Sequence, residues 1–225
     1  MQMQSPPSEE QLEAAIARGR ILTLKTYLLS EKGRGIIERI GGKILEHFGR
    51  EDLKTLTYTL TKELVMNATK ANLKRAIFKE LGLDIHSHAD YEIGMQRFKE
   101  VLEDSKSQEY KSVFKAADYW TMITYYYDAT VLNIKVKNSF PILPVEEERV
   151  REKLATARTY TSLAELLADM DRTEGAGLGL AMICVSLNNK GIDNRSFTLR
   201  SNEYDETAAK LEIPLSDEYV PKLLQ

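Results

Sequence analysis

Three polar side chains of one predicted helix have the types and the spacing needed to handle a metal-bound phosphate. Glu63, Asn67 and Lys70 recur at i, i+4 and i+7 in the segment TLTKELVMNATKANLKR, so on a helix they share one face. An amide oxygen can coordinate Mg²⁺, an ammonium group can contact phosphate, and a carboxylate can orient or deprotonate a hydroxyl nucleophile. The same spacing also fits a solvated helix face with one Glu–Lys pair. This segment alone leaves both interpretations open.

The second segment of interest is rich in glycine and reads EGAGLGLAMICVSL over residues 174–187. Alternate glycines at Gly175, Gly177 and Gly179 let the backbone approach a ligand closely, and a helix behind them directs amide groups toward an anion. The segment lacks the Gly-Lys-Ser/Thr of a P-loop, and Leu180 replaces the small residue of a dinucleotide-binding fingerprint. It is either an anion-binding turn or a loop ahead of a core helix.

Together, the two segments resemble the GHKL ATPase superfamily, which includes gyrase, Hsp90, histidine kinases and MutL and has the Bergerat fold. Residues 63–71 (ELVMNATKA) are similar to the N box of a histidine-kinase ATP-binding domain, and residues 175–180 (GAGLGL) are similar to its G2 box. The boxes occur in the family's order, with predicted strands between them. Residues 212–215 read Glu-Ile-Pro-Leu, a common end of the last strand in that domain. The resemblance covers about residues 50–216.

The resemblance implies that the chain binds ATP with Mg²⁺ between these boxes. Asn67 would coordinate the Mg²⁺ ion that bridges the ATP phosphates, Glu63 would act as the general base or polarising carboxylate, and Lys70 would approach phosphate. A third box of the family places an aspartate at a strand end to accept the adenine amino proton. Here Asn138 stands in that position, within KVKNSFPI, and the usual glycines do not follow it. Its amide oxygen can accept the proton, without the charge-assisted bond of a carboxylate, so Asp in its place should bind ATP more tightly.

The G2 box would form the ATP lid in the same comparison. Gly175, Gly177 and Gly179 would be the hinge and the phosphate cradle, and Leu178 and Leu180 would hold the lid helix to the core. These roles come from the resemblance, because the glycines by themselves indicate only a close approach of the backbone.

Two departures from a classical histidine kinase shape the functional expectation. The stretch from Asn67 to Asn138 is longer than usual, so residues 79–117 are an insertion that we expect to be helical. It can be a dimer surface, a regulatory cover over the site or decoration.

The other departure is the phosphoacceptor: only His47 precedes Asn67, it lies close before the N box, and no acidic residue follows it. We therefore expect His47 to be a helix-end residue and a partner protein to supply the acceptor, as for the anti-sigma-factor kinases of the superfamily.

The sequence thus predicts an Mg-ATP-binding, histidine-kinase-like protein that acts as a signalling ATPase or kinase on a partner protein. The alternative is a non-catalytic module that senses nucleotide or dimerises through its N-terminal helices. The N and G2 boxes favour the first function, and the altered third box favours the second.

Composition narrows the class of protein. The chain has 225 residues and a formal net charge of −3, which gives no general electrostatic reason to bind nucleic acid or an anionic membrane. No run approaches the roughly 20 apolar residues of a spanning helix. Cys184 is the only cysteine, so no intrachain disulfide can form. We expect a cytoplasmic protein without a nucleic-acid or membrane partner, and a homodimer is one option.

The elements that must position these residues indicate an α+β fold of the Bergerat type, a two-layer sandwich with helices packed on one face of a mixed sheet. We expect an N-terminal tail and helices over residues 1–49, the ATP-binding domain over 50–216 and a C-terminal tail over 217–225. Apolar periodicity predicts helices at residues 8–29, 36–49, 57–81, 146–155 and 178–187, and strands at 120–127, 130–137, 196–201 and 208–214. We expect a break at Gly33–Gly35 between the first two helices, and the third helix begins at Asp52 or Thr57.

Overall fold

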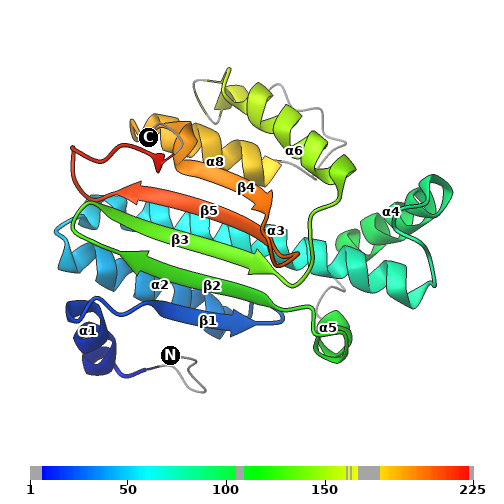
Figure 1. Ribbon diagram of the computed structural model, residues 1–225, viewed down its shortest axis with the longest axis horizontal. Helices are drawn as coiled ribbons and strands as arrows, with labels where there is room; N and C mark the ends of the chain where they lie inside the picture. Colours follow the sequence, from blue (N-terminus) through cyan, green and yellow to red (C-terminus); the bar gives the residue numbers. More distant parts are fainter. Residues whose placement is uncertain (1–6, 105–108, 161, 163, 167–177, 223–225) are drawn as a thin grey trace.

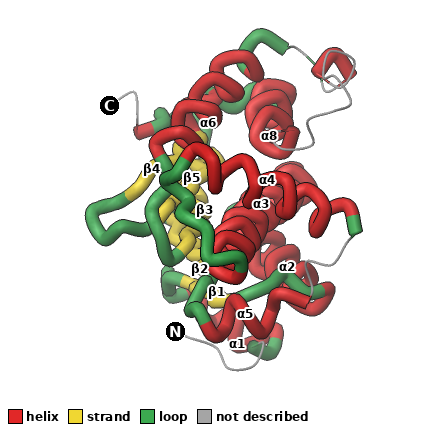
Figure 2. Tube along the Cα trace, turned by 90° about the vertical axis from the view of Figure 1, so that its right-hand side faces the viewer, coloured by secondary structure: helices red, strands yellow, loops and turns green. Residues whose placement is uncertain are grey.

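The computed structural model describes residues 7–104, 109–160, 162, 164–166 and 178–222. These residues form a two-layer α+β fold in which helices cover one face of a five-stranded sheet (Figure 1). Figure 2 shows the same arrangement from the side, with the strands in one layer and α2, α3 and α8 in the other. The predicted helices-on-sheet sandwich is confirmed.

The sheet has the strand order β1-β2-β3-β5-β4. Every pairing between its described strands is antiparallel, so the sheet is not mixed. Short hairpin connections join β2 to β3 and β4 to β5, and such connections require antiparallel neighbours. The strands are β1 (Leu22–Thr26), β2 (Thr121–Tyr127), β3 (Val131–Asn138), β4 (Phe197–Ser201) and β5 (Thr207–Pro214).

The helical layer is built around one long helix, α3, which runs behind the sheet (Figure 1). The remaining helices pack beside α3 or at the ends of the sheet. Their bounds are α1 (Glu9–Ala17), α2 (Glu31–His47), α3 (Lys54–Glu80), α4 (His88–Glu103), α5 (Lys111–Ala116), α6 (Pro144–Ala157) and α8 (Leu178–Asn189), with 3₁₀ turns at Glu51–Leu53 and Asn194–Ser196. Among the described residues, none of these helices combines the length and apolar character needed to cross a membrane.

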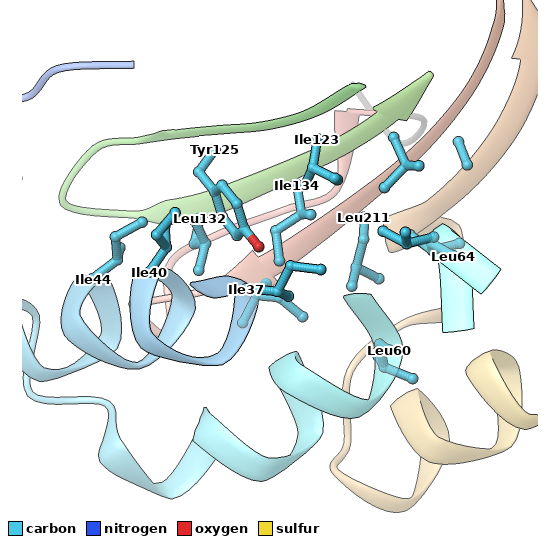
Figure 3. Close-up of a cluster of buried hydrophobic side chains, with 14 of the residues drawn as sticks. Ile37, Ile40, Ile44, Leu60, Leu64, Ile123, Tyr125, Leu132, Ile134 and Leu211 are labelled. Carbon is cyan, nitrogen blue, oxygen red and sulfur yellow. The ribbon is translucent and has the colours of Figure 1, made fainter. Parts of the chain in front are cut away.

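The main core lies between the inner face of the sheet and the helices α2 and α3 (Figure 3). One row of strand residues, from Leu22 of β1 across to Phe197 of β4, faces inward and is buried in every strand. Removing this apolar surface from water is the main stabilising contribution to the fold. Figure 3 labels ten of the contributing side chains: Ile37, Ile40, Ile44, Leu60, Leu64, Ile123, Tyr125, Leu132, Ile134 and Leu211.

The N-terminal segment differs from the expectation. The helix predicted to continue to residue 29 ends at Ala17, and Gly19 adopts a φ of +62° just after it. The prediction was wrong because Leu22 continues the helical spacing of the apolar residues before Gly19, although LTLKT also alternates as a strand does. The extended segment β1 pairs with β2, so the first 49 residues supply an edge strand and two helices to the same core.

The predicted break at Gly33–Gly35 is also wrong. Both glycines lie inside α2, which begins at Glu31. The Ser30 side chain accepts a hydrogen bond from the Gly33 amide at 3.2 Å and caps the helix, so two glycines near the first turn do not interrupt it.

The expected insertion is mainly helical in the part that the structure describes. Its helices α4 and α5 pack on the C-terminal half of α3 in a second apolar cluster, separate from the main core. Gly94 brings α4 against α3, because a Cβ atom there would lie 2.3 Å from the Phe78 ring. This close approach fixes where α4 sits relative to the candidate site.

Candidate functional site

Helix α3 holds the three polar side chains on the side of the helix that borders a cavity. Its residues Leu60, Leu64 and Ala68 are buried against the core. Glu63, Asn67 and Lys70 are half-buried, and the last two line the cavity. The predicted common face of this helix is therefore present.

The first turn of α8 meets that face. A Cβ atom built on Gly179 would lie 2.9 Å from Glu63 Oε2 and 3.3 Å from Asn67 Nδ2. Only a residue without a side chain can sit this close to both groups without displacing them. The structure thus brings together the two segments that the sequence analysis singled out, although more than one hundred residues separate them.

Asn67 has an unsatisfied polar group at this junction. Its Nδ2 atom is buried and has no hydrogen-bond partner among the described residues. A buried donor without a partner is costly in free energy, so such groups often mark a place where an external group binds. The neighbouring Glu63 carboxylate and the Asn67 side-chain oxygen give this junction oxygen atoms that could bind a metal ion.

These residues fit Mg²⁺ only as part of a metal–phosphate complex. In the part of the chain that the structure describes, no three His, Cys, Asp or Glu residues are grouped closely enough to hold a metal by themselves. Mg²⁺ is commonly bound through one or two protein oxygens, several waters and the phosphates of a substrate. Asn67 and Glu63 match that requirement.

A cavity of about 270 Å³ extends from this junction between α3, the inner face of the sheet, α4, α6 and α8. Its lining is mostly apolar, with a few polar and charged side chains, which is the usual composition of a small-molecule site. Leu180, only 8% exposed, contributes to both the cavity and the main core. Helix α4 contributes Met95, Phe98 and Leu102, and β3 contributes Val136 and Asn138.

Asn138 lines the cavity at the end of β3, and the structure explains why this position holds an amide. Its Nδ2 group donates hydrogen bonds to the Ala68 carbonyl oxygen at 2.9 Å and to Asn72 Oδ1 at 2.7 Å. Asn72 in turn donates to the Tyr119 carbonyl oxygen at 2.9 Å. A carboxylate has no donor for these two acceptors. Because Nδ2 is used by these two acceptors, the side-chain oxygen Oδ1 is the Asn138 atom that could accept a hydrogen bond from a ligand in the cavity.

Glu146 of α6 ties that helix to α3 beside the cavity. Its carboxylate accepts hydrogen bonds from Lys74 Nζ at 2.6 Å and from Arg75 Nη2 at 3.1 Å. Burial alone would raise the pKa of this carboxyl, but the positive charges of Lys74 and Arg75 outweigh that effect and lower the pKa to about 2. Two cations that could have formed an exposed basic stripe are therefore partly buried and paired.

Among the described residues that line the cavity, cations outnumber carboxylates. The cations are Lys70, Lys74, Arg149 and Lys153, and the carboxylate is that of Glu146. The helix α8 also begins near Glu63 and Asn67, so its positive dipole end lies at the same junction. The arrangement suits a ligand with an apolar body and an anionic group.

The remaining predicted site residues divide into two groups. Gly175 and Gly177 lie outside the described residues, as does the side chain of Leu178, which begins α8. His47 is exposed at the end of α2 and packs edge-on against Phe48, with ring centroids 4.9 Å apart. A helix-end position is what its sequence context predicts.

Sequence reasoning missed three contributors to the site. The helical spacing of Met95, Phe98 and Leu102 predicts a helix, but gives no sign that this face closes a cavity. Asn72 lies next to the N box and carries no distinguishing signal in one sequence. Glu146 has a local signal, since it occupies the third position of α6 and accepts from the Leu143 amide at 3.1 Å, but its pairing with α3 depends on the tertiary fold.

Comparisons with known proteins are sparse. No family model matches the chain, and no solved structure matches it. The sequence is 33% identical over 207 residues to an uncharacterized protein of Treponema pallidum (strain Nichols). The match covers 91% of this chain and 40% of that protein, so the chain spans less than half the length of this relative.

Proposed function

We propose that this protein binds Mg·ATP in the cavity between α3, α6, α8 and the sheet, as a histidine-kinase-like ATPase domain of the GHKL superfamily. The observation that carries the proposal is the contact of Gly179 with Glu63 and Asn67, which unites the N-box-like and G2-box-like segments at one cavity. The cationic side chains of the lining and the unsatisfied Asn67 Nδ2 donor support an anionic ligand that accepts a hydrogen bond. A cytoplasmic location is part of this proposal.

Each site residue has a role in the proposal. Asn67 would hold the Mg²⁺ ion by its amide oxygen, and Lys70 would contact phosphate. The bound ion would neutralise phosphate charge. Glu63 would orient or deprotonate the hydroxyl that attacks phosphorus, either that of water or that of a partner protein. The side-chain oxygen Oδ1 of Asn138 would accept a hydrogen bond from the base, while Nδ2 keeps its bonds to Ala68 and Asn72.

The product class follows from the source of the nucleophile. His47 is exposed at the C-terminal end of α2, outside the helices that line the cavity, so a partner protein would supply the phosphoacceptor, or water would release phosphate. The second candidate is a regulatory module that binds nucleotide without chemistry, alone or as a homodimer. The amide at Asn138 favours this candidate, because an amide bonds the base less strongly than a carboxylate does.

Titration calorimetry of the full chain with ATP, in the presence of Mg²⁺ or of EDTA, tests the binding. We expect Mg²⁺-dependent binding, and ATP at 100 times its dissociation constant should stabilise the protein by about 2.7 kcal/mol. Asn67→Ala should remove the Mg²⁺ dependence, whereas Asn189→Ala, at an exposed position of α8, should preserve it. Absence of heat and of thermal stabilisation at millimolar nucleotide would refute the proposal.

Phosphate release separates the two candidate functions. If the site is catalytic, Glu63→Gln should bind Mg·ATP with nearly parental affinity but lose most of its phosphate release or transfer. If the parent protein binds Mg·ATP and neither releases phosphate nor labels any protein of its own host extract, the regulatory module is the correct interpretation.

A further inference from the structure

We propose that α4 of the insertion forms the wall against which the base of the nucleotide lies, so that Met95 and Leu102 are ligand-binding residues. This inference rests on the proposed nucleotide-binding function. It assigns the insertion a direct part in the site, in place of a dimer surface or decoration.

The position of α4 along α3 is the first argument. Met95, Phe98 and Leu102 belong to the cluster that packs on the C-terminal half of α3, beside Leu73 and Ile77. Because a helix rises about 1.5 Å per residue, this cluster lies roughly 10 Å along the α3 axis from Asn67. The close approach of Gly94 to the Phe78 ring holds α4 in this place.

The chemistry of the cavity changes along the same direction. Asn67 and Lys70 line its polar end, beside the junction of Glu63 with Gly179, where the proposed metal and phosphates would bind. Asn138, bonded to Ala68 and Asn72, lies farther along α3. Phosphates at the polar end and a base at Asn138 would direct the base toward α4, whose side chains there are apolar.

Contacts across the cavity edge keep this wall in place. The Tyr91 hydroxyl of α4 accepts a hydrogen bond from Arg149 Nη1 of α6 at 3.3 Å, and the Arg149 guanidinium lies 5.6 Å from the Tyr91 ring centroid. Lys74 of α3, bonded to Glu146, lies 5.7 Å from the Tyr91 ring and 5.8 Å from the Phe98 ring. Helix α4 is thus anchored to both α3 and α6, and a preorganised wall costs little ordering free energy on binding.

The wall is apolar, and its residues that line the cavity are partly accessible to a ligand. Phe98 is 5% exposed and supports the second cluster, whereas Met95 and Leu102 are half-buried and line the cavity. The opposite side of α4 carries Ile93, which is 56% exposed and lines no part of the cavity. This helix therefore offers two wall variants and a matched control within three turns.

The test compares two ligands, Mg·ATP and Mg·tripolyphosphate, by titration calorimetry. Tripolyphosphate carries the phosphate chain without a base. Met95→Ala and Leu102→Ala should each weaken Mg·ATP binding by about tenfold, because each removes apolar contact with the base, and should leave the affinity for Mg·tripolyphosphate unchanged. Ile93→Ala should leave both affinities unchanged.

The outcomes distinguish this inference from the proposed function. If the parent binds Mg·ATP and both wall variants bind it equally well, α4 does not touch the base and the inference is wrong, although the proposed function stands. Equal loss of affinity for both ligands would also overturn it, because the variants would then act through general support of the fold. A parent that binds neither ligand would overturn the proposed function and this inference together.

Discussion

Gly179 lies so close to Glu63 that a Cβ atom on the glycine would be 2.9 Å from the carboxylate oxygen Oε2. This contact joins the start of α8 to the polar face of α3 from opposite ends of the domain's sequence. It favours a residue without a side chain at position 179, because a Cβ atom there would displace the Glu63 carboxylate.

Gly179→Ala should weaken Mg·ATP binding by tenfold or more, because the added methyl group displaces the Glu63 carboxylate and the Asn67 amide. The displaced atoms are the ends of side chains, so the free energy of unfolding should change by less than about 1 kcal/mol. Calorimetric titration and urea unfolding measure the two effects. Gly42→Ala is the matched control: its Cβ atom meets nothing within 4 Å, and helix propensity should stabilise it by about 0.5–1 kcal/mol. Undiminished affinity of the Gly179 variant would contradict the proposed site.

Asn138→Asp should destabilise the protein by about 2–4 kcal/mol and should not tighten ATP binding, contrary to what the resemblance alone suggests. The substitution replaces a donor amide by a carboxylate that faces the Ala68 carbonyl oxygen and Asn72 Oδ1. Protonation restores one donor, so the loss of stability relative to the parent should shrink as the pH falls from about 7 to 4. Urea unfolding at several pH values measures this. A variant as stable as its parent at neutral pH would show that the amide network is dispensable.

The long elements follow from local pattern, and the exceptions have physical causes. Helix α3 and the hairpin β2–β3 show clear periods of 3.6 and 2, and both are where the sequence predicts them. The prediction of helix at strand β1 was wrong because the strand has only five residues. Their alternation is a weaker signal than the helical spacing that begins with the apolar residues of α1. Its conformation is decided by pairing with β2, about one hundred residues later. Tertiary context overrides local preference in such short segments.

The candidate site divides in the same way. Glu63, Asn67 and Lys70 could be grouped from one helix, and Gly179 could be added through a resemblance. The cavity wall from α4 and the bond between Glu146 and Lys74 could not be predicted in this way. The local sequence of residues 88–103 and 144–157 does not indicate which surface each helix covers. Long-range packing places them, and a single sequence does not encode it in readable form.

Glu146→Gln should make stability less dependent on acid pH. In the folded parent the pKa of this carboxyl lies near 2, below its ordinary value of 4.5. The ion pairs therefore stabilise the folded state fully when the pH is above 4.5. This contribution, at most about 3 kcal/mol, is lost as the pH falls from about 4.5 to 2. The Gln variant lacks it throughout and should be less stable than the parent at pH 7, with the two converging in acid. Thermal unfolding across this range measures the difference, and a constant gap would contradict the assignment. Glu147→Gln, at a neighbouring and more exposed position, is the control.

Gly94→Ala should destabilise the protein by about 1–3 kcal/mol, although alanine is the better helix former. Its Cβ atom would lie 2.3 Å from two atoms of the Phe78 ring, and Phe78 is itself buried, so α4 or the ring must move. Phe78→Leu removes the distal ring atoms and should relieve the clash. The double variant should therefore be more stable than the sum of the two single effects predicts, by about 1 kcal/mol or more.

Gly35→Ala in α2, where nothing lies within 4 Å of the added Cβ atom, should show no coupling to Phe78→Leu. Urea unfolding of the parent, the three single variants and the two double variants gives both coupling free energies. Strict additivity of Gly94→Ala and Phe78→Leu would mean that α4 does not press on α3 at this point, and the wall proposed for the cavity would lose its support.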